Sequence, residues 1–388
     1  MTVKEELPKP EIWCPPIEEL KLCSKKEILI ILTSLSSQTK SLLKKQLEES
    51  KGLLPEGTRK FVIGEIEKVI TPCADGPTYS FGRNRTHYIN SAKIRCAVDI
   101  WIPDSTPVAT LIFCHGLFEH AMRYTHVIAQ FVEKGFLVIA PTLPGFGDSG
   151  GKRWAVKKIK NLADEISHVF DLFIESNSAL SKVPHFLLGH SMGGSTVMMA
   201  GIIDHRLWGN GGGVMLSAPA LAVDPSLSTP VKRFFGPIVA SILPRIPIAK
   251  PFEEGELVSS CHFISGTEDP LMKTKGTPAV TGLALMNVEG FFNENLYKED
   301  LGIPIFMMMG DADKIVDISA ADKLKVVKSA SVKMWPGLKH EILRETVWRG
   351  VANDFLRWSS ERVKDAYRTK IALKCKKDYE VDWETGEK

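Results

Sequence analysis

The sequence predicts an α/β fold with a mostly parallel central sheet, helices on both faces and one inserted subdomain. Short, nearly continuous apolar runs predict strands that are buried on both faces, and helical stretches of about ten or more residues separate most of them. These runs are ATLIFCHG, FLVIAPTLPG, HFLLGHS, GGGVMLSAP and IPIFMMMGDAD. Helical crossovers between buried strands are typical of a parallel sheet. A chain of 388 residues is long enough to bury such a core.

The N-terminal part is expected to form an arm followed by an amphipathic helix. Between Lys25 and Ser50, apolar residues recur at three- and four-residue steps, with lysines on the opposite face. Such a helix packs on the body of the protein, lies on a membrane surface or mediates dimerisation, and the pattern does not separate these roles. Two alternating segments then predict antiparallel strands with one face in water, FVIGEIEKVI and KIRCAVDIWIP.

A long gap interrupts the alternation of strands and helices. About eighty residues separate GVMLSAP from IPIFMMMG, too many for a simple crossover, which predicts an insertion. Its first part, VKRFFGPIVASILPRIPIAKPF, is apolar and bracketed by basic residues, so it forms either a lid over a pocket or the packed side of a cap. The expected organisation is an arm and helix at 1–58, the sheet domain at 59–219 and 301–366, a cap or lid at 220–300, and a charged tail at 367–388.

Composition excludes several classes of function. The chain carries 49 basic and 46 acidic residues, a net charge of +3, so nothing favours nucleic acid as a partner. Seven cysteines without C-x-x-C or zinc spacings favour a reducing compartment and no metal site. The N-terminus has no signal-peptide pattern and no run of about eighteen apolar residues occurs, so we expect a cytoplasmic protein. The oligomeric state is not determined by these features.

Two pentapeptides fit G-x-S-x-G, a spacing that can present a nucleophilic serine. Ser149, in GDSGG, follows a strand that runs into a loop of proline and glycine with no helix directly behind it, which indicates a turn residue. Ser191, in GHSMG, lies between the apolar strand HFLLG and the helical stretch STVMMAGIID, which predicts a tight strand-to-helix turn. Side chains at Gly189 and Gly193 would collide with the flanking strand and helix. Ser191 is therefore the candidate nucleophile.

A serine hydroxyl needs a histidine base and a carboxylate that orients it. Of the ten histidines, three follow Ser191 in the chain, namely His205, His262 and His340. His205 belongs to the helix after the nucleophile and His262 to the insertion, whereas His340 follows a short strand and is expected to open a helix. His340 is therefore the candidate base.

The loop GDADKIVD supplies the candidate acids Asp311, Asp313 and Asp317 directly after a buried strand, and we choose Asp313. Upstream, His115 and Gly116 end another strand, which can turn its following amides toward an oxyanion. Leu117 and Met192 are the expected amide donors. This chemistry needs neither a metal nor an organic cofactor.

These motifs resemble those of the monoacylglycerol lipase and lysophospholipase-like family of α/β-hydrolases, which also contains plant esterases. The similarity covers roughly residues 80–360 and rests on HGLFEHAMRY, GFGDSGG, GHSMGG, SAP, EDPL, GDADKIVD and PGLKHEIL. The resemblance implies the same triad of Ser191, Asp313 and His340, with Leu117 and Met192 in the oxyanion hole.

The resemblance also implies roles near the alcohol-binding end of the site. Glu119 and Arg123 would lie at that polar end, or form a structural ion pair behind it. The family usually has glycine where Phe118 stands, so this ring could reshape the alcohol pocket. It also usually has aspartate and histidine at the positions of Thr142 and Phe146.

The expected activity is that of a serine ester hydrolase, which releases a fatty acid from a monoacylglycerol-like lipid through an acyl-enzyme on Ser191. The alternatives are a lysophospholipase or small-molecule carboxylesterase, a proline-iminopeptidase-like peptidase, and a non-catalytic protein that binds apolar ligands. A peptidase needs acidic groups for a substrate ammonium, for which the cap offers Glu253, Glu254 and Glu256. A lipid substrate suits peripheral membrane contact, and one basic stretch is either a solvated helix face or a lipid-docking patch. Its basic residues are Lys152, Arg153, Lys157, Lys158 and Lys160.

Overall fold

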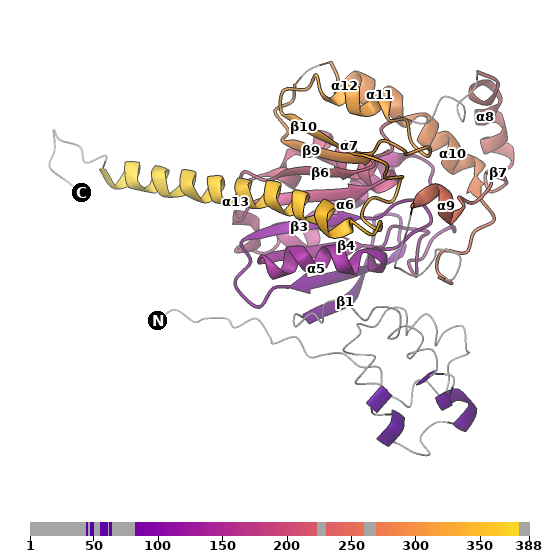
Figure 1. The fold of residues 1–388 in the computed structure, drawn as a ribbon, viewed down its shortest axis with the longest axis horizontal. Helices are drawn as coiled ribbons and strands as arrows, with labels where there is room; N and C mark the ends of the chain where they lie inside the picture. Colours follow the sequence, from indigo (N-terminus) through magenta and orange to yellow (C-terminus); the bar gives the residue numbers. More distant parts are fainter. Residues whose placement is uncertain are drawn as a thin grey trace.

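An eight-stranded sheet forms the centre of the computed structural model (Figure 1). The structure describes residues 82–222, 230–259, 269–298 and 300–379, and short pieces at 44–45, 47–49, 55–60 and 62–63. In spatial order the strands are β1 (Gly82–Ile89), β2 (Arg95–Ile102), β4 (Phe136–Pro141), β3 (Ala109–Cys114), β5 (His185–His190), β6 (Gly213–Ser217), β9 (Ile305–Gly310) and β10 (Ala330–Trp335).

The five apolar runs form five strands of the parallel part of this sheet, as predicted, and β10 adds a sixth beside β9. β3, β4, β5, β6 and β9 are buried along their whole length, because helices cover both faces. Their register aligns Cys114 with Gly189, and His190 with Ser217, so their carboxyl ends meet at one edge. The mostly parallel α/β sheet predicted from sequence is confirmed, and the loops that follow these ends can converge on one site.

One of the two predicted antiparallel strands is wrong. β2 lies within KIRCAVDIWIP, but its antiparallel partner is β1, whereas the described residues Val62 and Ile63 of FVIGEIEKVI are helical. β1 has the polar sequence GRNRTHYI and lies at the edge of the sheet. Its arginines are paired: Arg83 and Arg85 both form ion pairs with the buried Asp99 of β2. An edge strand held by charge pairs has no apolar pattern to find.

Helices cover both faces of the sheet (Figure 1). On one face, apolar side chains of α6 (Ile159–Phe170), α7 (Met192–Ile203) and α12 (Ser319–Leu324) pack on the sheet. On the other face, α5 (Thr125–Glu133) and α13 (Trp348–Tyr379) do so. α13 continues past the expected boundary at 366 and projects away from the body. The connections include four short helical segments, η1 (Ala121–Tyr124), η2 (Asp171–Glu175), η3 (Leu180–Lys182) and η4 (His205–Trp208).

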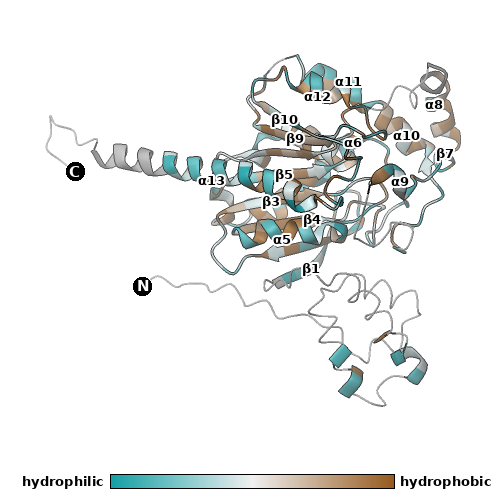
Figure 2. Ribbon diagram, in the orientation of Figure 1, coloured by the Kyte–Doolittle hydropathy of each residue, from teal (hydrophilic) through white to brown (hydrophobic). Residues whose placement is uncertain are grey.

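The segment predicted to be an insertion lies between β6 and β9, and its role as a cap or lid stays a prediction. Its described elements are α8 (Pro230–Ile242), β7 (Pro247–Ala249), α9 (Glu254–Leu257), β8 (Thr277–Pro278), α10 (Ala279–Met286) and α11 (Val288–Asn295). Figure 1 places α8, α10 and β7 at the end of the molecule opposite the tip of α13. α8 is largely apolar (Figure 2). Its two phenylalanines, Phe234 and Phe235, are exposed.

Of the predicted N-terminal helix, the structure describes Lys44, Lys45 and 47–49, which are helical, and the remainder of 25–50 lies outside the described residues. Within the described part of the chain, no helix combines the length and apolarity needed to cross a bilayer. Cys96 and Cys114 are free and buried. The expectations of a cytoplasmic location and a reducing compartment stay predictions.

Candidate active site

Ser191 occupies the tight turn between β5 and α7. Its backbone has φ 55° and ψ −120°, a region that residues with a Cβ rarely adopt. Hydrogen bonds hold the turn: the Ser191 amide donates to the carbonyl of Ser217 at 3.0 Å, and the Ser191 carbonyl accepts from the amides of Gly194 and Ala220. Ser191 therefore stands on a strand-to-helix turn at the carboxyl end of β5, as the sequence predicts.

The glycines around Ser191 are required by close backbone approaches. A Cβ at Gly189 would lie 2.3 Å from the carbonyl oxygen of Gly193, and a Cβ at Gly193 would lie 2.2 Å from that of Cys114. Both distances are shorter than any carbon–oxygen contact, and backbone atoms cannot give way as a flexible side chain can. G-x-S-x-G therefore describes a steric requirement at this turn.

His340 and Asp313 complete a chain of hydrogen bonds with Ser191. The His340 Nε2 atom lies 2.8 Å from the Ser191 Oγ atom, and its Nδ1 atom lies 2.7 Å from the Asp313 Oδ2 atom. The other Asp313 oxygen, Oδ1, accepts hydrogen bonds from the amides of Ile315 at 2.8 Å and Val316 at 3.3 Å. Both side chains are buried. This is the geometry of nucleophile, base and orienting acid.

Burial and charge act in opposite directions on these groups. Burial lowers the pKa of His340, but the Asp313 carboxylate, with Glu341 and Glu119 behind it, raises that pKa above 6.5. Burial raises the pKa of Asp313, but His340 and the two backbone amides bring that pKa below its usual range. The pair therefore favours an ionised acid beside an imidazole that gains a proton readily.

The rival residues from the sequence lie elsewhere. Asp311 is exposed and accepts a hydrogen bond from the Gly337 amide, while Asp317 accepts one from Ser319 at the start of α12. His205 lies in η4, and His262 is outside the described residues. One expectation is wrong: His340 does not open a helix, because turns occupy 341–347 and α13 begins at Trp348.

The loop after β3 approaches the nucleophile from the other side. A Cβ at Gly116 would lie 3.2 Å from the Ser191 Cβ atom, so this loop touches the serine. Met192 is the first residue of α7, a position whose amide has no acceptor within its helix. Leu117 follows Gly116 in the loop. The two expected amide donors therefore flank the serine turn.

Phe118 has a left-handed backbone, with φ 65°, and its ring is buried. The left-handed region favours glycine, so a phenylalanine at this position carries backbone strain. The Phe118 ring packs edge-on against Trp154 at 5.3 Å between centroids, and Trp154 packs edge-on against Phe146. The rings of Phe118, Trp154 and Phe146 therefore form one packed aromatic cluster.

Glu119 is held by three groups of the protein. Its carboxylate accepts hydrogen bonds from the Gly116 amide at 2.8 Å, the Tyr124 hydroxyl and the Arg123 Nε atom at 3.2 Å. Burial raises the pKa of Glu119, whereas His190, Arg123 and Tyr124 lower it, to about 2. Arg123 also lies 3.6 Å from the buried Glu341. These contacts favour the structural ion pair over a direct contact with substrate.

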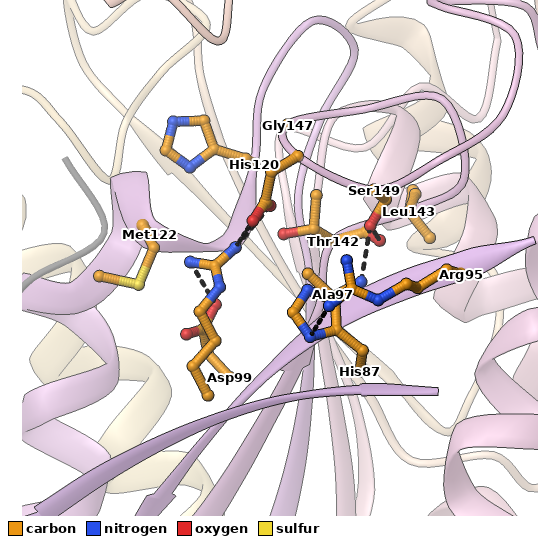
Figure 3. Close-up of polar contacts among 12 residues, drawn as sticks. His87, Arg95, Ala97, Asp99, His120, Met122, Thr142, Leu143, Gly147 and Ser149 are labelled. Carbon is orange, nitrogen blue, oxygen red and sulfur yellow. Dashed lines mark hydrogen bonds and ion pairs between the residues drawn. The ribbon is translucent and has the colours of Figure 1, made fainter. Parts of the chain in front are cut away.

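Ser149 is a turn residue in the structure (Figure 3). Its hydroxyl donates to the carbonyl oxygen of Thr142 at 2.6 Å and accepts from the amide of Ala97 at 2.9 Å. The second G-x-S-x-G serine is thus used to tie its loop to β2. The Thr142 hydroxyl, where the family usually has aspartate, is buried without a hydrogen-bond partner.

In the basic stretch after this loop, one residue bonds to other parts of the protein and another lies on an exposed helix face. Arg153 donates to the carbonyls of Gly147 and Leu271, and its guanidinium lies 3.8 Å above the Trp154 ring. Lys160 pairs with Asp164 on an exposed face. Among the described residues, no group of three or more metal-ligating side chains is suited to hold an ion.

Sequence reasoning missed one buried pair beside the site. The His120 Nε2 atom lies 2.8 Å from the Asp269 Oδ2 atom, which joins the loop after β3 to the insertion. Both residues stand in family motifs, HGLFEH and EDPL, but 149 positions separate them. The sequence does not reveal that the two residues pair, so neither of them stands out as a functional residue.

Known proteins with similar sequences include lipases. The chain is 28% identical over 280 residues to a monoacylglycerol lipase of Mycolicibacterium smegmatis, covering 71% of this chain and 96% of that protein. It is 26% identical over 291 residues to the human monoglyceride lipase, covering 72% and 91%.

Solved structures show the same fold. A soluble variant of the Saccharomyces cerevisiae monoglyceride lipase, in complex with a substrate analog, superposes with a TM-score of 0.59 at 18% identity, covering 74% of this chain and 96% of that one. The Hydrolase_4 family, described as serine aminopeptidase, S33, matches residues 105–347, more than half of the chain. This protein is therefore a member of the Hydrolase_4 family and has the α/β-hydrolase fold.

Proposed function

We propose that this protein is a serine ester hydrolase that releases a fatty acid from a monoacylglycerol-like lipid through an acyl-enzyme on Ser191. The observation that carries the proposal is the continuous hydrogen-bonded chain from Ser191 through His340 to Asp313 on a strained strand-to-helix turn. This arrangement converts a weak alcohol nucleophile into a reactive one.

The proposed reaction has two steps, acylation of Ser191 and hydrolysis of the acyl-enzyme, and the same groups act in both. Neutral His340 takes the Ser191 proton as Oγ bonds to the ester carbonyl carbon, and the amides of Leu117 and Met192 stabilise the oxyanion. Protonated His340 then gives that proton to the leaving alcohol as the carbon–oxygen bond breaks. Water repeats the sequence on the acyl-enzyme, releasing the fatty acid, while Asp313 maintains the useful tautomer of His340.

An acyl lipid is the substrate class that fits best. The sequence relatives named above are lipases of monoacylglycerol, and the proposed cap carries an apolar helix, α8, which packs on α10. Burying each methylene of an acyl chain is worth about 0.8 kcal/mol, so an apolar cap favours a long chain.

The test compares the wild type with Ser191→Ala on a long-chain monoacylglycerol, the matching lysophospholipid and a short soluble ester. We expect release of fatty acid from the monoacylglycerol, with turnover in the variant lower by up to about a millionfold. Ser149→Ala is the matched control, because it removes the other G-x-S-x-G serine. Equal loss in both variants, or full activity in Ser191→Ala, would contradict the proposal.

The family description leaves an aminopeptidase as the second candidate. An aminopeptidase needs a free carboxylate for the substrate ammonium, but the buried Glu119 is already held by Gly116, Tyr124 and Arg123. In the cap, Glu253 and Glu256 are exposed. The Glu256 carboxylate accepts a hydrogen bond from the Glu253 amide at 2.8 Å, and the Glu253 carbonyl oxygen accepts one from the Glu256 amide at 2.9 Å. Faster cleavage of aminoacyl amides than of esters would favour the peptidase.

We also propose that the cap binds the surface of an anionic membrane through α8 and the turn to β7. Eight large apolar residues between 234 and 248 are exposed: Phe234, Phe235, Ile238, Val239, Ile242, Leu243, Ile246 and Ile248. The segment 230–252 contains four basic and no acidic residues, which suits anionic lipid head groups.

Liposome flotation tests this surface. Burying a phenylalanine or isoleucine is worth about 1.5–3 kcal/mol, so Phe234→Ser with Ile242→Ser should weaken binding to anionic vesicles at least about 100-fold. Hydrolysis of a short soluble ester should not change. Ile89→Ser, at an exposed isoleucine of β1, is the control. Equal binding of the vesicles by both variants would contradict the proposal that this surface binds the membrane.

A further inference from the structure

The buried pair of His120 and Asp269 connects the oxyanion loop directly to the insertion. His120 belongs to the loop 116–120 after β3, and Asp269 follows β6 in the inserted segment. The two side chains are 3% and 7% exposed, and their Nε2 and Oδ2 atoms are 2.8 Å apart. A hydrogen bond this short between two desolvated groups holds both elements in one arrangement.

Each partner is itself fixed by neighbouring groups. The Asp269 Oδ1 atom accepts the Leu271 amide at 2.9 Å, and Arg153 bonds the Leu271 carbonyl together with that of Gly147. A Cβ at Gly147 would lie 2.9 Å from the His120 Cβ atom, and Figure 3 shows these two residues side by side. His120 is therefore held between the loop that contains Gly147 and the insertion.

A second link from the insertion reaches the same loop. The Thr281 hydroxyl in α10 donates to the Trp154 carbonyl at 2.5 Å and accepts from the Val156 amide at 2.9 Å. Trp154 packs edge-on against Phe118 of the oxyanion loop. The insertion thus supports the loop at two of its residues.

The position of the Leu117 amide depends on both ends of its loop. On one side, the Gly116 amide is bonded to Glu119, a contact made within the sheet domain. On the other side, Phe118 and His120 are packed against or bonded to groups that the insertion holds. An oxyanion donor must keep its geometry within about 0.5 Å to be effective.

We propose that His120 and Asp269 are positioning residues. Their buried pair couples the position of the cap on the sheet domain to the geometry of the oxyanion loop. The inference rests on the proposed function, because it assigns Leu117 to the oxyanion hole. A pair that acts only on stability would change the unfolding free energy and leave the turnover of folded enzyme unaltered. The proposed role predicts a loss of turnover in enzyme that is fully folded.

The experiment measures kcat and KM for a short soluble ester, which does not need the apolar cap, in His120→Phe and His120→Gln. Phenylalanine keeps the ring and removes the nitrogen, whereas glutamine can place an amide donor near the position of Nε2. We expect kcat to fall about 10- to 100-fold in His120→Phe with KM within about threefold, and to recover mostly in His120→Gln.

The matched control is Glu289→Gln. It weakens another contact between the insertion and the sheet domain, the 3.0 Å ion pair of Glu289 with Lys323, which does not touch the oxyanion loop. Wild-type kcat in His120→Phe, or an equal loss in Glu289→Gln, would overturn the inference. If Asp269, left unpaired, prevents folding of His120→Phe, the double variant with Asp269→Leu decides by the same kcat criterion.

The result is separable from that of the proposed function. Full activity of Ser191→Ala would refute the serine mechanism itself. Inactive Ser191→Ala combined with wild-type kcat in His120→Phe would keep that mechanism and refute only the coupling between cap and loop.

Discussion

Replacing Asp313 by asparagine exchanges one carboxylate oxygen for an NH2 group and should disable the proposed base. The Asp313 Oδ1 atom accepts hydrogen bonds from the amides of Ile315 and Val316, so an asparagine there must keep its carbonyl oxygen at that position. Its NH2 group then faces the His340 Nδ1 atom, now 2.7 Å from Asp313 Oδ2. Nδ1 has to accept this hydrogen bond, which moves the imidazole proton to Nε2.

The magnitude follows from that tautomer. With a proton on Nε2, His340 donates toward Ser191 and cannot take the serine proton, although every distance is nearly unchanged. An asparagine at the acid position of such a triad lowers kcat by about 10⁴, which corresponds to about 5 kcal/mol of transition-state stabilisation. Loss of the carboxylate charge should also lower the pKa of His340, since that charge contributes to raising it.

The assay is steady-state hydrolysis of a short soluble ester together with the rate of labelling by a fluorophosphonate. Asp311→Asn and Asp317→Asn are the controls, because both aspartates belong to the same loop but bond to Gly337 and Ser319 instead. Thermal melting checks that the isosteric variants remain folded. We expect the controls to keep activity within about threefold.

Two results would refute this reasoning. Asp313→Asn with kcat within tenfold of the wild type would mean that the backbone amides do not impose the orientation of the asparagine, or that Asp313 is not the acid. An equal loss in Asp311→Asn would mean that the whole loop matters and not one carboxylate.

Three further predictions concern pH and packing. Because the Asp313 carboxylate outweighs burial and raises the pKa of His340 above 6.5, and only the neutral ring accepts a proton, kcat/KM should be low in acid and rise with pH through an apparent pKa above 6.5; a profile flat between pH 5 and 8 would contradict this. Gly193→Ala should lower the urea unfolding free energy by about 3 kcal/mol, whereas Gly290→Ala, with open space around it in α11, should raise it by about 0.5–1 kcal/mol. Phe118→Gly relieves about 1–3 kcal/mol of backbone strain but loses a buried ring worth about 3–5 kcal/mol, so urea unfolding should show a net destabilisation despite the left-handed φ; greater stability would be inconsistent with this balance.

A strand could be predicted from the sequence where both of its faces are buried. β3, β5 and β9 have both faces covered, so the sequence must be apolar at every position and the run is visible without alignment. β1 is an edge strand whose Arg83 and Arg85 are balanced by Asp99, and a strand stabilised in that way has no hydrophobic period.

The site was predictable where local sterics or chain order define it. The requirement for glycine at 189 and 193 acts within one turn, and the order serine, acid, histidine follows from the succession of strands. The pairing of His120 with Asp269 could not be anticipated, since it depends on where the insertion lies on the sheet domain.

The sequence by itself determined the α/β class and the serine on the strand-to-helix turn, because each depends on contacts between near neighbours or on burial of a whole element. Only the tertiary structure shows the contacts themselves: Asp313, the acid chosen from the sequence, faces His340, and Glu119 bonds the Gly116 amide. The physical reason is that a hydrogen bond needs a donor–acceptor distance within a few tenths of an ångström and a suitable angle at the hydrogen. Those quantities are set by how loops from separate strands pack together.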